Sequence, residues 1–291
     1  MGFISNLISG LSLGSIYALI ALGYTMVYGI AKMLNFAHGD IIMAGAFAMI
    51  VFVANCGLNP VFAVLLGILF CVILGVTVER VAYKPLRKAS PLSVLITAIG
   101  VSYLLQNVAL LIFGSDKRSF PKIIDFDAIK IGELTIKGES VVTLILTAAI
   151  MVVLTLFIAH SKTGKAMRAV SEDKDAAELM GINVNRTISI TFAIGSALAA
   201  VAGLFYGATY TFIGPYTGAM PGIKAFVAAV FGGIGSIPGA MLGGILLGVI
   251  ENLSKAYIST ELSDAIVFAV LILVLMIKPT GLLGKKISEK V

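Results

Sequence analysis

The sequence predicts an all-α membrane protein, a bundle of about eight transmembrane spans in which some segments are broken or re-entrant. Of its 291 residues, 59% are hydrophobic and only 12% are charged, and the mean hydropathy is +1.04. Residues 61–77 and 141–159 contain no Asp, Glu, Lys or Arg. A soluble protein of this length needs charged side chains to cover its surface, so these tracts indicate bilayer spans.

Five runs along the chain are long enough to cross a membrane. A helix needs about 20 apolar residues to cross the hydrocarbon layer with its backbone hydrogen bonds satisfied. The runs that meet this requirement are 7–30, 61–82, 92–113, 141–159 and 187–210. A shorter apolar run, 264–277, follows them. We expect all of these to belong to one transmembrane domain covering residues 1–291.

Three further apolar segments are too short or too interrupted to be simple spans. They are 40–54, 226–234 and 240–251, and the sequence Gly-Ser-Ile-Pro-Gly at 235–239 separates the last two. Backbone breaks at membrane depth occur only where protein or water covers the freed polar groups. We therefore expect broken or re-entrant segments here.

The distribution of basic residues predicts the orientation. If successive spans alternate and the region around Gly235 counts as two crossings, two thirds of the 21 Lys and Arg residues fall on one side. The positive-inside rule makes that side cytoplasmic, with the N-terminus outside and the C-terminus inside. Residues 115–139 are then an outer loop, with a strand pair expected at 131–136, and residues 161–186 are a cytoplasmic loop. The net charge of +6 resides in these clusters at span ends, which predicts contact with lipid headgroups and no nucleic-acid partner.

Two helices share a pattern of small residues. The pattern Gly-Ser-x-x-Ala-x-x-Ala occurs at residues 14–21 and again at residues 195–202. The two helices run in opposite directions on the orientation above, which is what an inverted repeat requires. The alternative is that small residues recur here by chance, since they also serve helix packing.

Polar residues inside the apolar helices are the candidates for a translocation path, because polar groups at membrane depth face a partner or water. The candidate residues are Tyr17, Tyr24, Tyr28, Asn35, His38, Thr97, Gln106 and Asn107. The alternatives are hydrogen bonds between helices and, for residues 35–40, capping of a helix start. We expect no buried Lys and no buried acids in these helices, which disfavours a proton relay and favours a neutral or zwitterionic solute.

The loop at 161–186 predicts a short helix on the cytoplasmic face. Ser171 followed by Glu172 and Asp173 is typical of a helix start, and Gly181 is typical of a stop, which leaves about nine residues. A helix of this length is not stable alone and must pack against something. We expect its partner to be a soluble protein; a solvated loop helix is the alternative.

Several stretches resemble the permease subunits of ABC importers, and in particular the LIV-type branched-chain amino-acid permeases. Residues 175–181 resemble the coupling motif EAA-x-x-x-G of such permeases, with Asp in place of Glu. The longer stretches that carry the resemblance are 14–19 (GSIYAL), 34–40 (LNFAHGD), 164–169 (GKAMRA) and 231–240 (FGGIGSIPGA). The similarity extends along almost the whole chain.

The resemblance implies a set of partners and a role for the cytoplasmic loop. It implies a heterodimer with a second related permease, two cytoplasmic ABC ATPases and a periplasmic solute-binding protein, in a bacterial inner membrane. It also implies that residues 168–181 form a coupling helix seated on one ATPase. The residues that this assigns to coupling are Arg168, Glu172, Asp173, Asp175, Ala176, Ala177 and Gly181.

The chain is predicted to have no enzymatic activity, cofactor or metal of its own. The phosphate-binding motif G-x-x-x-x-G-K-S/T is absent, so ATP is expected to be used by the partner subunits. No His or Cys cluster suggests a metal or catalytic centre. Rival predictions are an ion-coupled secondary transporter, a passive facilitator, and an ABC permease for urea, short amides or other amino acids.

Overall fold

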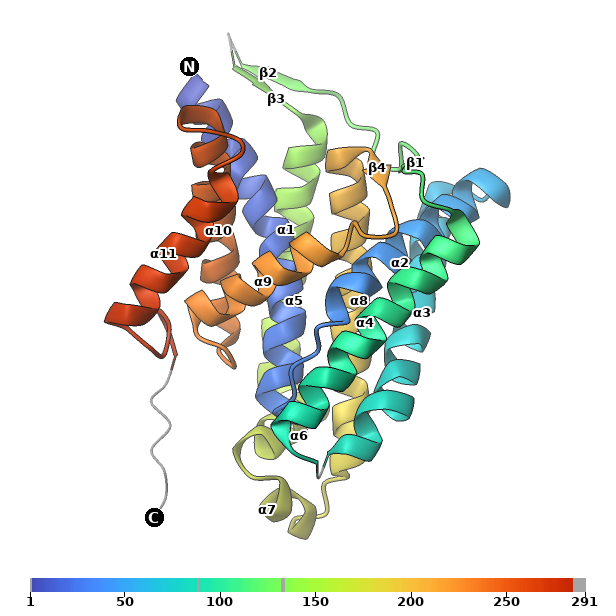
Figure 1. Cartoon of the computed structure of the whole chain (residues 1–291), viewed down its shortest axis with the longest axis vertical. Helices are drawn as coiled ribbons and strands as arrows, with labels where there is room; N and C mark the ends of the chain where they lie inside the picture. Colours follow the sequence, from blue (N-terminus) through green and yellow to red (C-terminus); the bar gives the residue numbers. More distant parts are fainter. Residues whose placement is uncertain (1, 88, 132–133, 285–291) are drawn as a thin grey trace.

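The computed structural model describes residues 2–87, 89–131 and 134–284 as a bundle of helices (Figure 1). Seven of its helices are long and apolar enough to span a membrane. By label they are α1 (Gly2–Ala31), α2 (His38–Ile50) with its π-helical continuation η1 (Val51–Asn55), α3 (Pro60–Val78), α4 (Pro91–Phe113), α5 (Gly138–His160), α8 (Val184–Tyr210) and α10 (Ile237–Tyr257). The predicted all-α multi-pass fold is confirmed.

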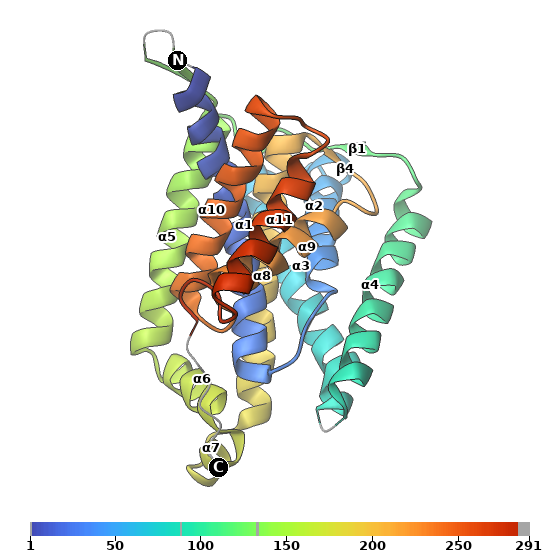
Figure 2. The ribbon, with the colours of Figure 1, turned by 60° about the vertical axis from the view of Figure 1, so that its left-hand side comes forward.

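Helix α1 lies at the centre of the bundle, with α8, α10 and α5 around it (Figures 1 and 2). From Ser12 to Val27 every residue of α1 is buried. Helices α3, α4 and α5 instead turn large apolar side chains such as Leu69, Leu111 and Val153 outward. Apolar exteriors of this kind match a hydrocarbon solvent, so α3, α4 and α5 form the flank of the protein that lipid or a membrane partner covers.

Close approach of α1 and α10 depends on small residues. A Cβ atom added at Gly14 would lie 2.6 Å from the carbonyl oxygen of Ile245 on α10. Such a distance leaves no room for any side chain, so the glycine at position 14 allows the two backbones to touch.

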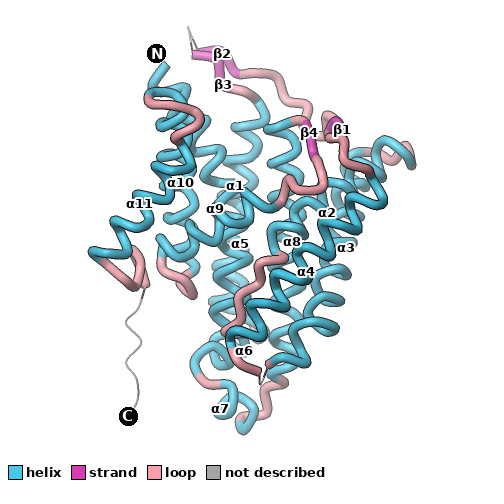
Figure 3. Tube along the Cα trace, in the orientation of Figure 1, coloured by secondary structure: helices cyan, strands magenta, loops and turns pink. Residues whose placement is uncertain are grey.

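The segment predicted as broken at 40–54 is one continuous helical segment. Helix α2 begins at His38 and continues into η1, giving a span of 18 residues. Counting apolar residues missed its first turn, because His38 and Asp40 are polar yet buried. The break lies before the helix, where residues 32–37 lead from the end of α1 back to the start of α2 (Figure 3).

The region predicted as two short segments at 226–234 and 240–251 contains one short and one full helix. Helix α9 (Ala219–Gly232) has 14 residues, and after a turn α10 runs for 21 residues. The prediction for α10 was wrong because its first turn looked like a breaker. Ser236 caps the helix by accepting a hydrogen bond from the Gly239 amide, and Pro238 stands in the first turn, where proline is tolerated.

The two ends of the bundle differ. The N-terminus lies beside the hairpin of β2 (Ile129–Ile131) and β3 (Leu134–Ile136), and residues 132–133 between the strands are outside the described part (Figure 1). The expected strand pair at 131–136 is thus confirmed for the described residues. At the opposite end lie α6 (Lys162–Glu172) and α7 (Lys174–Leu179). We call these ends the hairpin face and the α7 face.

The relative directions of the helices agree with alternation. Helix α1 runs from the hairpin face toward the α7 face, α8 runs the opposite way, and α11 (Ser263–Ile277) descends from the hairpin face (Figures 1 and 2). A second strand pair, β1 (Arg118–Ser119) with β4 (Phe212–Ile213), joins the loop that follows α4 to the segment that follows α8. Some basic residues behind the orientation prediction, Lys88, Lys285, Lys286 and Lys290, lie outside the described residues. The inverted repeat itself stays a prediction.

Candidate functional site

Three of the predicted path residues meet Asp40 or one another in a buried cluster between α1, α2 and α4. The Gln106 side-chain amide donates to the Asp40 carboxyl at 2.9 Å and lies 3.2 Å from the Ser102 hydroxyl. The ring of Tyr24 stands edge-on to His38, with centroids 4.8 Å apart. We call Tyr24, His38, Asp40 and Gln106 the central cluster; all four are buried.

His38 is the member of the central cluster with unused hydrogen-bonding capacity. Its Nε2 atom is buried and has no hydrogen-bond partner among the described residues. Its ring lies directly over Gly23, where an added Cβ would meet the imidazole. A buried polar atom without a hydrogen-bond partner costs stability.

Asn35 lies nearer the α7 face, in the loop that precedes α2. Its side-chain oxygen Oδ1 accepts a hydrogen bond of 2.8 Å from the Tyr83 hydroxyl on η2 (Glu79–Tyr83), the π-helical continuation of α3. Both side chains are buried. The contact fixes the loop against α3, so it does not have the form of the helix cap that the sequence left as an alternative.

The other predicted path residues are not part of the central cluster. Tyr17 is buried but donates its hydroxyl to Glu251 at 2.9 Å. Tyr28 and Thr97 are half-buried, and Asn107 is exposed and donates only to the Tyr103 carbonyl one turn away on α4. The structure therefore disperses the predicted set. Tyr24, His38 and Gln106 belong to the central cluster, and the others lie at the Tyr83 contact, beside Glu251, near the end of α1 and on α4.

The expectation that the spans contain no buried acid or lysine was wrong. Glu251 on α10 is 0% exposed, and its carboxylate contacts Lys224 of α9 at 2.8 Å and Lys255 at 2.5 Å. Lys224 also contacts Asp264 of α11 at 2.7 Å. We call Lys224, Glu251, Lys255 and Asp264 the ion cluster. The available sequence signal was one charged residue inside the apolar stretch 219–232 and two inside 237–257.

A second buried carboxylate lies near the α7 face. Glu79, at the end of α3, is fully buried; it pairs with Arg87 and accepts a hydrogen bond of 2.7 Å from Ser189 on α8. Arg87 also donates to Asn185 at the start of α8. The end of α3 and the start of α8 are therefore joined by charged and polar contacts.

The predicted coupling helix is two helices with a corner between them. Ser171 was expected to start the helix, but it lies inside α6 and its hydroxyl donates to the Arg168 carbonyl at 2.7 Å. Asp173 is the actual cap of α7, and its carboxylate accepts from the amides of Asp175 and Ala176 at 2.9 and 3.0 Å. The prediction failed because two neighbouring residues both suit a cap, and Asp173 is the one in extended backbone.

Helix α7 presents an apolar tip away from the bundle. Leu179 is 88% exposed and Met180 is 83% exposed, whereas Ala177 is buried against the protein. Gly181 ends the segment with φ of +80°, the left-handed conformation that favours glycine. Among the other predicted coupling residues, Glu172, Asp175 and Ala176 are exposed, and Arg168 donates to the Ala159 carbonyl at 2.8 Å.

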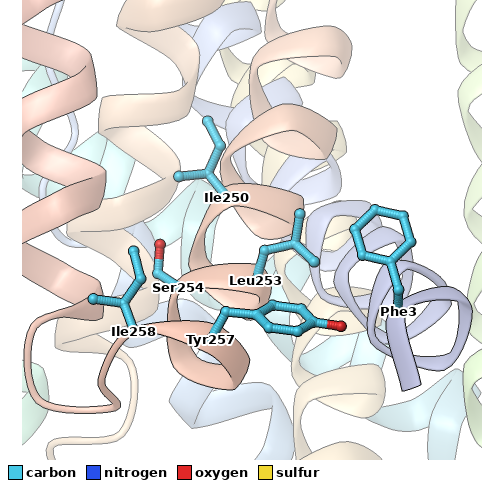
Figure 4. A pocket seen from close by; sticks show the side chains of 6 residues that line it. All are labelled: Phe3, Ile250, Leu253, Ser254, Tyr257 and Ile258. Atoms are coloured by element: carbon cyan, nitrogen blue, oxygen red, sulfur yellow. The ribbon is translucent and has the colours of Figure 1, made fainter. Parts of the chain in front are cut away.

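A large apolar groove lies away from all of these clusters. It has a volume of about 470 Å³ and lies beside the N-terminal end of α1 (Figure 4). Its lining residues are Phe3, Ile250, Leu253, Ser254, Tyr257 and Ile258. Its lining carries no charged group, so it offers nothing to bind the ammonium and carboxylate of an amino acid.

Comparisons with known proteins agree with the resemblance. The family model described as the branched-chain amino acid transport system permease component matches residues 6–275. The high-affinity branched-chain amino acid transport system permease protein LivH of Salmonella typhimurium is 46% identical, over 99% of this chain and 98% of its own. LivH of Escherichia coli K12 has the same identity and coverage. BraD of Pseudomonas aeruginosa, which carries the same description, is 45% identical over 99% of this chain and 98% of its own. The chain therefore belongs to the family of permease components of branched-chain amino acid transport systems.

Proposed function

We propose that this chain is the subunit through which branched-chain amino acids cross a bacterial inner membrane, driven by ATP hydrolysis in partner subunits. The observation that carries the proposal is the 46% identity to LivH over 99% of the chain. In this proposal the complete importer has a second related permease, two ABC ATPases on the α7 face and a periplasmic solute-binding protein at the hairpin face. The N-terminus is then periplasmic and the C-terminus cytoplasmic.

The physical basis is alternating access with α7 as the input. The exposed Leu179 and Met180 give an ATPase an apolar anchor, and burying such side chains in an interface contributes binding energy. Movement of the docked ATPases displaces α7, and the permease then exchanges an outward-open for an inward-open state. The chain contributes differential stability of the two states rather than chemistry.

The central cluster is our candidate for the solute path. Tyr24, His38, Asp40 and Gln106 place polar groups at membrane depth where α1, α2 and α4 meet, and His38 retains a free ring nitrogen among the described residues. Polar groups of this kind lower the cost of moving an ammonium and a carboxylate through the membrane. We propose that the solute passes this cluster at the interface with the second permease.

Reconstitution into proteoliposomes tests the proposal. The chain, its partner permease and the ATPases are reconstituted with the binding protein, and uptake of radiolabelled leucine is measured with and without ATP. Leucine uptake that requires ATP is the expected result. Uptake by the chain alone under an ion gradient would instead establish a secondary transporter. The buried acids Glu251 and Glu79 are the observation that favours this alternative, because ion-coupled transporters use buried acids.

A further inference from the structure

A hydrogen bond joins the start of α7 to the end of α1, although 143 positions separate the two residues in the sequence. The Lys174 ammonium at the start of α7 donates to the carbonyl oxygen of Ala31 at 2.8 Å. Ala31 is the last residue of α1, so its carbonyl is one of those that the helix leaves without an internal partner. A cation at this position also complements the negative end of the helix dipole.

Lys174 makes this contact in surroundings that disfavour a positive charge. Partial burial, followed by the nearby charges of Arg87 and Lys32, lowers the pKa of Lys174 below its ordinary value. Among the described residues Lys174 forms no ion pair with a carboxylate, although Asp173 and Asp175 flank it in sequence. The side chain therefore points inward to α1 rather than outward to its acidic neighbours.

The end of α1 leads directly into the segment that holds the candidate path residues. Lys32 adopts a left-handed conformation with φ of +58°, which turns the chain sharply away from the helix axis. The next residues carry Asn35, bonded to Tyr83, and then His38 of the central cluster. A displacement of Ala31 is thus passed on through only a few residues to both buried polar contacts.

Helix α7 is short and mostly exposed. It has six residues, one buried side chain at Ala177, and an exposed apolar tip at Leu179 and Met180. We propose that Lys174 is a positioning residue that transmits movement of α7 to the end of α1 and the loop at 32–37. This inference rests on the proposed function, because it assumes that an ATPase moves α7.

The test compares Lys174→Met with the matched control Lys165→Met in the reconstituted importer. Lys165 lies on the neighbouring α6 and is exposed. ATP hydrolysis, leucine uptake and co-purification of the ATPases are measured for each variant. We expect Lys174→Met to retain the ATPases and hydrolysis but to lower leucine uptake per ATP by about tenfold, because one charge-assisted hydrogen bond is lost. Lys165→Met should behave as the unmodified protein does.

Each other result has a separate meaning. Normal uptake per ATP in Lys174→Met would overturn the inference and leave the proposed function intact. Loss of the ATPases from Lys174→Met would also overturn it, because Lys174 would then be a docking residue. An unmodified importer that moves no leucine with ATP would refute the proposed function itself.

Two conservative variants keep the test decisive if Lys174→Met does not accumulate in the membrane. Lys174→Arg keeps a charged donor, and Lys174→Gln keeps a shorter neutral one. Transmission through the Ala31 carbonyl requires uptake per ATP to decrease in the order unmodified, Arg, Gln. Equal coupling in both variants would overturn the inference.

Discussion

At the scale of single residues, Glu251 is the group on which most polar contacts converge. Its carboxylate contacts Lys224 and Lys255 and accepts the Tyr17 hydroxyl, so it connects α10 to α9 and α1. Lys224 extends the connection to Asp264 on α11. A buried ion pair adds little net stability over an apolar packing, but removing one partner leaves an uncompensated charge.

Replacing Glu251 by Gln should therefore destabilise the protein strongly. The change leaves Lys224 with Asp264 as its only carboxylate partner among the described residues, and it should lower the free energy of unfolding by roughly 3–5 kcal/mol. The measurement is the thermal unfolding temperature in detergent. Unfolding is detected by the reaction of a thiol-specific dye with the buried Cys71, in a Cys56→Ser background. Glu261→Gln is the matched control, since Glu261 is exposed and forms no ion pair among the described residues. Equal unfolding temperatures for the two variants would contradict the role given to the ion cluster.

At the scale of elements, the sequence predicted the long apolar helices and failed where polar residues belong inside them. Apolar runs mark α1, α3, α4, α5 and α8 within a few residues of their observed bounds. The start of α2 and the end of α10 were missed because the polar residues Asp40 and Glu251 are buried and find partners in distant segments. Pairings between distant residues cannot be deduced from local periodicity, which is why the central cluster and the ion cluster required the structure.

The cap of α7 provides a test between the cap residue predicted from the sequence, Ser171, and the one seen in the structure, Asp173. Asp173→Ala removes the acceptor for two amides and should destabilise this six-residue helix by about 1 kcal/mol, whereas Ser171→Ala should leave it unchanged. Hydrogen exchange of the amides at 174–179 measures the difference directly. Faster exchange in Ser171→Ala and not in Asp173→Ala would restore the cap that the sequence favoured.

At the scale of the whole molecule, the bundle has an apolar girdle between two polar faces. Leu179 and Met180 depart from this arrangement, because they expose apolar side chains on the polar α7 face and not on the apolar flank. Exposed apolar groups in an aqueous region commonly mark a protein interface. The sequence predicted that this loop meets a soluble partner, and the structure adds which side chains are free to do so.

Changing Leu179 and Met180 together to Ser should separate the permease from its ATPases without unfolding it. The two side chains make no part of the buried core, so membrane insertion and thermal stability should be unaffected. Co-purification of the ATPases in mild detergent is the measurement, with Lys162→Ser and Lys165→Ser on α6 as the control. Retention of the ATPases by the double variant would move the docking surface elsewhere on the α7 face.

The central position of α1 also has a consequence for how the protein is made. Helix α1 leaves the ribosome well before α8 and α10, against which it packs. Until they arrive, Tyr17 and Tyr24 lack their partners Glu251 and Phe226, and the Gly14 surface has no neighbouring backbone. The nascent chain must therefore hold an unfinished core in the bilayer until α8 and α10 have been inserted, so α1 completes its packing only after these later helices enter the membrane.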